Sequence, residues 1–554
     1  MQAATTGGAG ASREETIAMR DGVKIGVAIY APSGAGKYPA LLAASPYRYD
    51  NNALPASPQF LWRETGPIEF YVAQGYAYVH MDVRGSGKSG GEFEFLGPNE
   101  QQDLYEVVEW IAKQPWSNDK VGGIGQSYYC MSQWLMGAMA PPSLACLGAH
   151  DGLNDPYRQS CYQGGIPGEF FGGHWWTQNR IINRFPANGS TPREQTTDLG
   201  LLLAQHPTYD EFWRSRCAWE RLEAIKIPVY SIAVWGKLDL HTRGNLDAYR
   251  KVQGPKKLRV SGAPSAWAAA QEFSSVDFHE RVLLPFYDRY LKGKETDYEK
   301  RPPVEYFVRG ANVFRVAETW PPAGIEHATW HLQAGPSGSV TSLNDGGLAP
   351  AAPQGAPATS YRYPNPGWVS GVVGFGPAGP AGGFDPVRRV LTFISAPLER
   401  DLEVTGSIKL VLYASSTRTD TDFFVKLAEQ HPQSPEDRAK GANPGAALVT
   451  KGWLRASHRA LDPARSTEME PYHTHTNPEP IVPGEVYKLA ISLEPTAYRF
   501  KRGNRIRLEI VNGDSPATDV IWTHLYPPNK IGEDTIHHSA QHPSALVLPL
   551  AGGA

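Results

Sequence analysis

Between residues 17 and 300, short apolar runs alternate with segments whose apolar residues recur at helical spacing. Each run has the length of a buried strand and is bounded by Gly, Pro or polar residues. Repeated strand–helix alternation is typical of a mostly parallel sheet with helices on both faces, so a doubly wound α/β domain is predicted. The predicted strands are 38–44, 77–83, 120–125, 144–150, 228–235 and 256–262.

The segment between the second and third predicted strands contains a glycine-rich turn and then the clearest helix. The turn, "DVRGSGKSGGEF", is not a phosphate-binding loop, because Asp82 stands where the Walker pattern requires Gly. We expect pairing of Asp82 with Arg84 to hold this turn. In the helix, acidic residues are expected to lie opposite an apolar stripe. The stripe consists of Leu104, Val107, Val108 and Ile111.

Residues 153–222 interrupt the alternation. The segment begins with aromatic and glycine-rich residues, and its remainder has helical character. It is inserted between two predicted strands, at the edge of the sheet where their carboxyl ends lie. We therefore expect it to form a helical cap over a functional site.

After residue 300 the hydrophobic pattern changes its period. Runs rich in β-branched residues now alternate apolar and polar positions, and Pro- and Gly-rich loops separate them. This pattern predicts an antiparallel β-sandwich. Such runs occur at 407–416, 422–430, 486–493 and 505–511. The predicted domains are a disordered lead-in (1–16), an α/β core (17–152 and 223–300), a cap (153–222) and an all-β domain (301–554).

Composition narrows the choice of partners. Hydrophobic residues make up 41% and charged residues 20% of the chain, and the formal net charge is -3. These values are ordinary for a soluble globular protein and argue against nucleic acid or an anionic membrane as the main partner. No run approaches the roughly 20 apolar residues of a membrane span. The N-terminus lacks the pattern of a signal peptide, so we expect a cytoplasmic protein, or a secreted one if a signal peptide has been removed.

The four cysteines do not form a metal-binding or disulfide-rich pattern. They are too sparse for a disulfide scaffold and show no C-x-x-C spacing. We expect free structural thiols, with a Cys161–Cys217 disulfide as the alternative for an exported protein. The cysteines are Cys130, Cys146, Cys161 and Cys217.

The stretch "VGGIGQSYYCMSQW" places Ser127 between a predicted strand and a predicted helix. A serine there fits the nucleophile elbow of α/β-hydrolases, in which a tight turn presents Oγ to the substrate. The next backbone N–H, that of Tyr128, then points toward the developing oxyanion. Two features depart from the usual pattern, because Tyr129 replaces a small residue and no histidine lies nearby. The alternative is that Ser127 only caps the helix.

Longer motifs extend this interpretation to nearly the whole chain. In the first half they are "MRDGVKIGVAIYAP", "SPYRYD", "DVRGSGKSGGEF", "GQSYY" and "FYDRYLKG". In the second half they are "DTDFFVKL", "KGWLRASHR" and "PGEVYKLAISLEPTAYRFKRGNRIRL". Their identity and order resemble the cocaine esterase / X-Pro dipeptidyl-peptidase (CocE/NonD) family of serine hydrolases. The resemblance implies an α/β-hydrolase core, a helical cap, a C-terminal jelly roll, no metal or organic cofactor, and hydrolysis of esters or amides through an acyl-enzyme.

The resemblance also implies roles for individual residues. Ser127 matches the nucleophile, and the Tyr47 hydroxyl matches the group that completes the oxyanion hole with the Tyr128 N–H. Asp239 matches the acid of the catalytic triad, in the chain order Ser–Asp–His. The family's histidine belongs in the turn that reads "SGAPSAWAAA" here, which contains no histidine. The nearest alignment puts Ala266 in its place.

Three explanations for the missing base stay open. An engineered replacement of the histidine by Ala266 fits best, because the other motifs are intact. Another histidine, His279 or His241, is the second explanation, although His241 lies only two residues from Asp239. The third is a natural variant that has lost hydrolysis or catalyses another reaction. Without a base, Ser127 stays protonated and acylation falls by orders of magnitude.

Aromatic residues are expected to form a pocket above Ser127 for an uncharged, bulky acyl group. The expected partner is a small-molecule ester or amide, and a homodimer is left open. An Xaa-Pro peptidase is disfavoured because no anchor for the amine of its substrate is apparent. The alternative functions are acyl transfer on the same scaffold and a catalytically inert binding protein. The pocket candidates are Tyr129, Phe171, His174, Trp175, Trp176 and Trp267.

Overall fold

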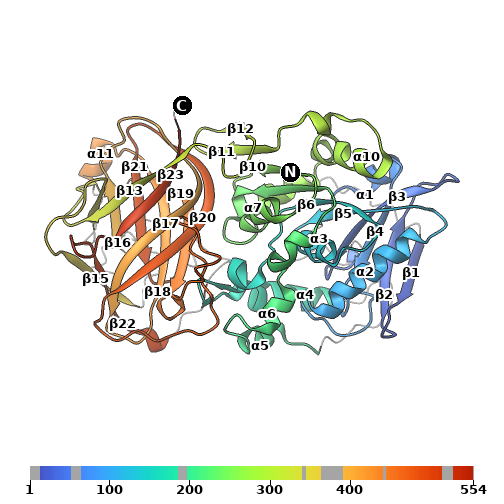
Figure 1. The fold of residues 1–554 in the computed structure, drawn as a ribbon, viewed down its shortest axis with the longest axis horizontal. Coiled ribbons are helices and arrows are strands. Elements are labelled where there is room, and N and C mark those ends of the chain that lie inside the picture. Colours follow the sequence, from blue (N-terminus) through green and yellow to red (C-terminus); the bar gives the residue numbers. More distant parts are fainter. Residues whose placement is uncertain are drawn as a thin grey trace. The chain divides into compact units, whose positions relative to one another are not determined.

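A mixed, mostly parallel β-sheet organises the first part of the chain (Figure 1). The computed structural model describes residues 13–51, 64–184, 196–339, 345–363, 391–440, 444–513, 524 and 528–552. The chain divides into two compact units. The first comprises Met1–Gln159, Phe171–Gln205 and Glu211–Tyr306, and the second comprises Ser160–Phe170, His206–Asp210 and Phe307–Ala554.

In the first unit the strand order is β1-β2-β4-β3-β5-β6-β9-β10-β11. Strands β1 and β2 are antiparallel additions at one edge, and all pairings from β4 to β11 are parallel. The six predicted strands are confirmed as β3, β4, β5, β6, β9 and β10. The strands are β1 (Arg13–Ala18), β2 (Lys24–Tyr30), β3 (Tyr38–Ser45), β4 (Ala77–Asp82), β5 (Ser117–Gln126), β6 (Leu144–His150), β9 (Val229–Val234), β10 (Lys256–Ser261) and β11 (Val304–Val308).

Helices cover both faces of this sheet. Successive residues of a strand point to opposite faces. A Cβ on Gly122 of β5 would meet Leu291 of α10, and one on Gly123 would meet Gln133 of α3. Helices α3 and α10 therefore lie on opposite faces. The helical segments of the core are α1 (Ile68–Ala73), α2 (Pro98–Ala112), α3 (Tyr128–Met139), η6 (Trp235–Lys237), α7 (Thr242–Lys251), α8 (Ala266–Ser274), α9 (Val276–Phe278), η7 (His279–Leu283), α10 (Leu284–Lys292) and η8 (Asp297–Lys300).

The α2 helix confirms the predicted apolar stripe, but only some of its acids lie opposite that stripe, since Glu106 and Glu109 are half-buried whereas two others are buried. Glu100 and Asp103 are fully buried. The Glu100 carboxyl accepts a hydrogen bond from the Tyr128 hydroxyl (3.0 Å). Asp103 forms a buried ion pair with Arg84 (2.7 Å). Buried carboxyls need such partners, because an unpaired one costs several kcal/mol.

The same ion pair corrects the predicted Asp82–Arg84 pairing. Arg84 points to Asp103 and Asp21, so it is not the partner of Asp82. The Asp82 carboxylate instead accepts the backbone N–H groups of Tyr49 (2.8 Å) and Lys88 (2.9 Å). The turn after β4 is therefore held by backbone donors that converge on one carboxylate.

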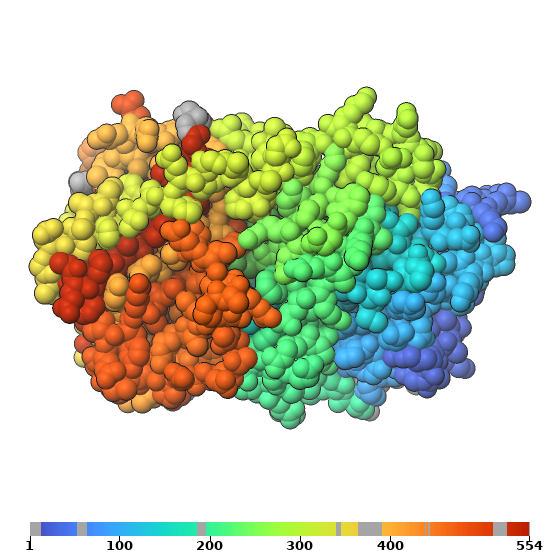
Figure 2. Space-filling model, in the orientation of Figure 1, coloured from blue at the N-terminus to red at the C-terminus, as the bar shows by residue number. Residues whose placement is uncertain are grey.

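The insertion at 153–222 contains several short helical segments and one small strand pair. It is divided between the two units: Ser160–Phe170 and His206–Asp210 belong to the second, and its other residues to the first. In the space-filling view, the green segments near residues 200–250 lie beside the blue segments of the first unit (Figure 2). Its elements are η3 (Tyr157–Cys161), β7 (Tyr162–Gln163), β8 (Ile166–Pro167), η4 (Phe170–Trp175), α4 (Trp176–Arg184), α5 (Leu199–Ala204), α6 (Glu211–Arg216) and η5 (Trp219–Ala224).

The second unit contains one closed sheet. Its strands follow the order β17-β20-β19-β18-β21-β16-β14-β13-β23, and β23 pairs back onto β17. The elements are β12 (Val313–Ala317), β13 (Ile325–Gln333), β14 (Asp345–Ala349), β15 (Ala358–Tyr363), β16 (Leu391–Ser395), β17 (Leu402–Ser416), β18 (Asp422–Gln430), α11 (Pro435–Ala439), β19 (Ala446–Arg455), η9 (Ala456–His458), β20 (Tyr487–Phe500), β21 (Arg505–Val511), η10 (Pro528–Lys530), β22 (Gly532–His537) and β23 (Ala545–Ala551).

Closure follows from the length and bending of β17. A register shift between Gly406 and Ile408 interrupts its pairing with β20, and bulges of this kind bend a strand. The bent strand also pairs with β22 and β23. The ring encloses an aliphatic core that includes Leu410, Ile491 and Leu508. The four strands predicted in this region are confirmed, and the predicted two-sheet arrangement stays a prediction.

Two further expectations concern the chain ends and the cysteines. Strand β1 begins at Arg13, so ordered structure starts within the segment assigned to the lead-in, whose first 12 residues lie outside the described residues. All four cysteines are free and buried, as expected for structural thiols. Across the described ranges, no helix has the length and apolar character needed to cross a membrane.

Candidate active site

Ser127 lies on the sharp turn between β5 and α3. Its backbone has φ 60° and ψ −120°, a conformation that costs a residue with a side chain on the order of 1–3 kcal/mol. The Ser127 N–H donates to the Asp151 carbonyl (2.9 Å), and the Gln126 N–H donates to the Glu64 carbonyl (2.8 Å). Ser127 is partly exposed, whereas Gln126 and Tyr128 are buried. The strained turn thus presents one hydroxyl at the carboxyl end of a central strand.

Gly125 explains why Tyr129 is tolerated where a small residue is usual. A Cβ on Gly125, whose φ is 125°, would lie 2.3 Å from the Cβ of Tyr129. The absence of a side chain at Gly125 therefore leaves the space that the Cβ of Tyr129 occupies, and helix α3 can lie close to β5. The ring of Tyr129 turns toward His80, whose Nε2 lies 2.7 Å from the phenol oxygen. A small residue at position 129 is not required for this turn.

The side chain in direct contact with Ser127 is that of His241, which lies just before α7. Its Nε2 is 3.0 Å from the Ser127 Oγ. Its Nδ1 accepts the backbone N–H of Leu153 (3.1 Å). Burial, the Lys237 ammonium and His150 hold the pKa of His241 well below its usual range, so the ring is neutral. Because Nδ1 is an acceptor, the ring proton lies on Nε2 and the histidine donates to the serine.

Three buried charged groups lie beside this pair. The Lys237 Nζ is 2.9 Å from Asp151 Oδ2 and 3.8 Å from Glu64 Oε1. Asp151 also accepts the side-chain N–H of Gln126 (2.9 Å). Burial acts to lower the pKa of Lys237, but Asp151 and Glu64 outweigh it and raise that pKa. The ammonium therefore stays charged throughout the neutral range.

Glu64 is the group whose protonation changes near neutral pH. Burial raises its pKa to about 7, against the opposing effects of the Lys237 ammonium and a hydrogen-bonding interaction with the Ser127 hydroxyl. Asp151 adds to the increase because it is a second carboxylate nearby. Carboxyls with such values are common where proton transfer occurs, since the group can give and take a proton at neutral pH.

Tyr47 provides a protonated phenol beside Ser127. Its hydroxyl accepts the indole N–H of Trp175 (3.0 Å) and interacts with the Ser127 hydroxyl. Burial and the Glu64 carboxylate raise the pKa of Tyr47 far above its usual value, so the phenol keeps its proton. Tyr128 supplies the first amide of α3, which by its position has no acceptor within the helix. The predicted roles of the Tyr47 hydroxyl and the Tyr128 N–H in an oxyanion hole stay predictions.

Asp239 lies half-buried in the turn between η6 and α7. In a triad, a carboxylate accepts the proton on Nδ1 of the histidine. At His241 that atom instead accepts the Leu153 N–H. The structure therefore brings His241 to Ser127 without pairing it to Asp239, and the predicted role of Asp239 stays a prediction.

Neither of the other two candidate base positions hydrogen-bonds Ser127 among the described residues, although Ser265, the residue before Ala266, packs against Gly236 beside Lys237. Ala266 is the first residue of α8, directly after the capping residue Ser265, and its assignment as the histidine position stays a prediction. His279 is buried, and both ring nitrogens are engaged. Its Nδ1 is 2.8 Å from the Tyr71 hydroxyl, and its Nε2 is 2.6 Å from the Phe273 carbonyl. His279 thus joins η7 to Tyr71 of α1 and has a structural role there.

The predicted pocket residues divide into a buried and an exposed set. Trp175 joins the site through Tyr47, and its ring centre is 5.2 Å from that of Phe171. Trp176 stacks on Phe93 with ring centres 5.4 Å apart, and Phe93 in turn lies 6.2 Å from Trp175. The buried set is Tyr129, Phe171, Trp175 and Trp176. The exposed set is His174 and Trp267, the latter with 51% of its surface exposed.

Sequence reasoning missed Glu64 and Lys237. Lys237 is the last residue of η6, three residues after β9 ends, and polar residues at the carboxyl ends of parallel strands are candidates for a site. This position made Lys237 a possible site residue, but the family resemblance pointed more specifically to Asp239, two residues later. Glu64 carried no local signal, because the segment before α1 shows neither strand nor helix periodicity.

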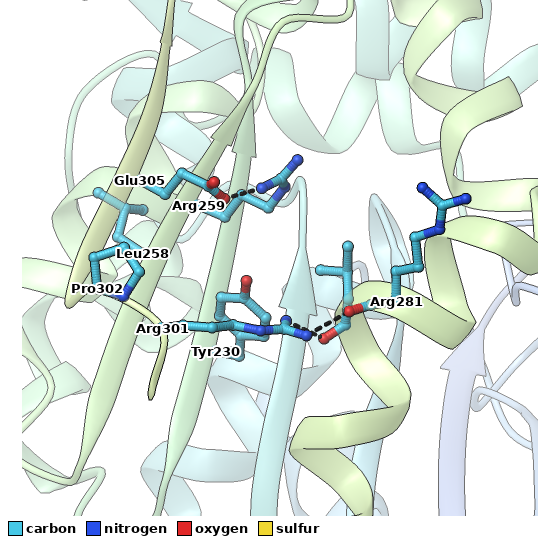
Figure 3. Close-up of a pocket in the computed structure, with 8 residues that line it drawn as sticks. Tyr230, Leu258, Arg259, Arg281, Arg301, Pro302 and Glu305 are labelled. Carbon is cyan, nitrogen blue, oxygen red and sulfur yellow. Dashed lines mark hydrogen bonds and ion pairs between the residues drawn. The ribbon is translucent and has the colours of Figure 1, made fainter. Parts of the chain in front are cut away.

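A separate pocket of about 260 Å³ lies along β9, β10 and η7 (Figure 3). Arg259 pairs with Glu305 there, and Arg301 donates to the Val282 carbonyl (2.9 Å). Arg281 pairs with Asp277 (2.6 Å). None of the residues that line this pocket belongs to the group around Ser127.

Comparisons with known proteins place these observations in a family. The family model of the X-Pro dipeptidyl-peptidase (S15 family) matches residues 21–264, and that of the X-Pro dipeptidyl-peptidase C-terminal non-catalytic domain matches residues 296–547. A putative serine esterase of Mycobacterium bovis is 28% identical, with 96% of this chain and 94% of the relative aligned. The cocaine esterase of a Rhodococcus species is 27% identical, covering 96% and 97%.

Among solved structures, a CocE/NonD family hydrolase from Staphylococcus aureus is similar to this chain with a TM-score of 0.79. The two share 26% identity, and the match covers 97% of this chain and 93% of the other. The parallel sheet, the serine on its strand-to-helix turn and these relatives define the chain as a hydrolase of the serine esterase and peptidase class. Within that class, it belongs to the CocE/NonD and X-Pro dipeptidyl-peptidase family.

Replacing Gly125 by Ala is expected to destabilise the first unit by roughly 2–4 kcal/mol, because the added Cβ would clash with Tyr129 at a strained φ. Gly75→Ala is the matched control, since its φ is 82° but no atom lies within 4 Å of the added Cβ. It should cost about 1 kcal/mol. Thermal unfolding of both variants measures the difference, and equal losses would contradict the packing role of Gly125.

Replacing Glu64 by Gln is expected to stabilise the fold increasingly as pH rises. The pKa of Glu64 is raised from 4.5 to about 7 on folding, so between these values the unfolded chain loses a proton that the folded chain retains. The contribution of Glu64 to stability is therefore full below about pH 4.5 and falls by on the order of 3 kcal/mol by pH 7. The Tm difference between variant and unmodified chain should grow across this range, and a constant difference would contradict the raised pKa.

Proposed function

We propose that this chain hydrolyses an ester or amide bond of a small molecule with a hydrophobic or aromatic acyl group, through an acyl-enzyme on Ser127. The observation that carries the proposal is the strained turn at Ser127, whose hydroxyl contacts His241 and lies beside the Tyr47 phenol. A strained, partly exposed serine surrounded by buried polar groups is typical of a nucleophile.

In this proposal Oγ attacks the acyl carbon, and the carbonyl oxygen becomes negatively charged. The Tyr47 hydroxyl and the Tyr128 N–H stabilise that charge, and preorganised donors of this kind act more strongly where water is excluded. The leaving alcohol or amine departs, and water then releases the acid. A histidine at position 266 is not needed, because Ser127 already has buried polar neighbours.

The preference for an apolar acyl group rests on the aromatic side chains around Tyr47. The Trp175 indole bonds its hydroxyl, and the rings of Tyr128 and Trp175 are stacked with centres 5.8 Å apart. Apolar walls with a few polar groups favour an uncharged ligand. We assign the role of cap to the insertion at 153–222 and a jelly-roll arrangement to the C-terminal unit, by analogy with the family.

Ser127 is expected to react with a fluorophosphonate probe in the unmodified chain, and Ser127→Ala should abolish the labelling. Ala266→His should raise the labelling rate less than about tenfold, because the buried Glu64 carboxyl already lies beside Ser127. Labelling that appears only after Ala266→His would show that the base is missing. Absence of labelling in every form would favour a binding protein, and product analysis with added alcohol separates hydrolysis from acyl transfer.

Tyr47→Phe should lower kcat about 10²- to 10³-fold for an ester with a hydrophobic acyl group, with little change in KM, because it removes one oxyanion donor. Tyr38→Phe is the matched control: its hydroxyl donates to the Gly34 carbonyl (2.8 Å) at the opposite end of β3. The measurement is steady-state hydrolysis by both variants. Equal kcat values for Tyr47→Phe and the unmodified chain would remove Tyr47 from the oxyanion hole.

A further inference from the structure

His241 is placed to donate a hydrogen bond to Ser127 and not to accept its proton. The Leu153 N–H occupies the lone pair of Nδ1, so the neutral ring has its proton on Nε2. The opposite tautomer would put a ring N–H against the Leu153 N–H and leave two buried donors without acceptors, which is costly. The atom nearest to Oγ therefore has no lone pair to offer.

Glu64 supplies one of two buried carboxyl oxygens beside the turn that lack a hydrogen-bond partner among the described residues, the other being Asp151 Oδ1. Its side chain is buried, with 5% of the residue exposed. One carboxyl oxygen, Oε1, faces Lys237, and Oε2 has no hydrogen-bond partner among the described residues. Among the described residues, Ser127 Oγ is hydrogen-bonded to His241, and the nearby Ser127 hydroxyl acts to lower the pKa of the Glu64 carboxyl. Its backbone carbonyl is bonded to the N–H of Gln126, the residue before the serine, so its distance from the turn is fixed.

From this geometry we infer that Glu64 is the general base for Ser127, with the His241 Nε2–H as a hydrogen-bond donor to Oγ. The inference rests on the proposed hydrolase function. The Glu64 carboxylate takes the hydroxyl proton as Oγ bonds to the acyl carbon and the carbonyl π electrons move to oxygen. When that tetrahedral species collapses, the C–O or C–N bond breaks and the Glu64 carboxylic acid protonates the leaving group. In the second half of the reaction the Glu64 carboxylate takes a proton from water as the water oxygen bonds to the acyl carbon. The bond from that carbon to Oγ then breaks, Glu64 returns the proton to Oγ, and the acid is released.

The Lys237–Asp151 ion pair makes this role feasible at neutral pH. Two carboxyls lie close together, so their repulsion and burial both oppose ionisation of Glu64. The Lys237 ammonium, at the end of η6, has the opposite effect and favours the ionised form of Glu64. The groups that face Glu64 from all packed elements are Lys237, Asp151, Tyr47, Tyr129 and Ser127. Burial is the largest effect on Glu64 and raises its pKa to about 7, where a general base is most effective.

The test compares Glu64→Gln with His241→Gln on p-nitrophenyl butyrate, an ester without an amino group. Glu64→Gln should lower kcat/KM by 10²- to 10⁴-fold, the usual contribution of a general base. His241→Gln retains a side-chain N–H donor and should lower it only about tenfold. Glu109→Gln is the matched control, since its carboxyl also accepts a serine hydroxyl, that of Ser143 at the far end of β6, and should leave kcat/KM unchanged.

The pH profile of kcat/KM separates the two bases without any variant. A Glu64 base predicts a loss of activity as pH falls through about 7, and His241→Gln should retain this limb. A His241 base predicts full activity well below pH 6, because the pKa of His241 lies far under its usual range. An unchanged rate in folded Glu64→Gln, or an acid limb that disappears in His241→Gln, would overturn the inference.

The outcome also distinguishes this inference from the proposed function. If the unmodified chain turns over the ester and is labelled at Ser127 by a fluorophosphonate, the hydrolase function stands even when Glu64→Gln has no effect. If Ser127 is neither labelled nor required for turnover, the function itself fails and the assignment of Glu64 as its base fails with it.

Discussion

A buried ammonium between two buried carboxyls is the interaction on which the arrangement around Ser127 depends. Lys237 is 2.9 Å from Asp151 and 3.8 Å from Glu64, and all three residues are buried. Such a group is stable only if each charge has partners, because burial alone would neutralise it. Lys237 and Asp151 form the closer ion pair, and burial raises the pKa of Glu64 to about 7.

The same positive charge also acts on the histidine. Burial and, to a lesser extent, the Lys237 ammonium lower the pKa of His241 well below its usual range, so the imidazole is neutral. A neutral ring has one donor and one acceptor nitrogen. Because the Leu153 N–H donates to Nδ1, Nδ1 is the acceptor and Nε2 carries the proton. One buried lysine therefore influences both neighbours of the serine: it favours the charged form of the carboxyl and the uncharged form of the imidazole.

Local periodicity was sufficient to predict the elements that carry the site. The six core strands, the α2 stripe and the turn at Ser127 depend on residues close together in sequence, and the structure contains all of them. The partner of Arg84 was not predictable in this way, because Asp103 reaches it from a helix 19 residues later. Closure of the C-terminal sheet depends on a register shift at Gly406, which alternation of apolar residues does not reveal.

The amino-acid sequence by itself determines that a serine stands on a strained strand-to-helix turn of a parallel α/β sheet, because short-range hydrophobic spacing and glycine placement specify that turn. Only the tertiary structure decides which groups meet its hydroxyl. Glu64, Asp151, Lys237 and His241 come from segments up to 177 residues apart in the numbering (241 − 64), and they converge where the carboxyl ends of neighbouring strands lie side by side. The pKa shifts of Glu64, Lys237 and His241 then follow from burial and neighbouring charges, which exist only once the chain has folded.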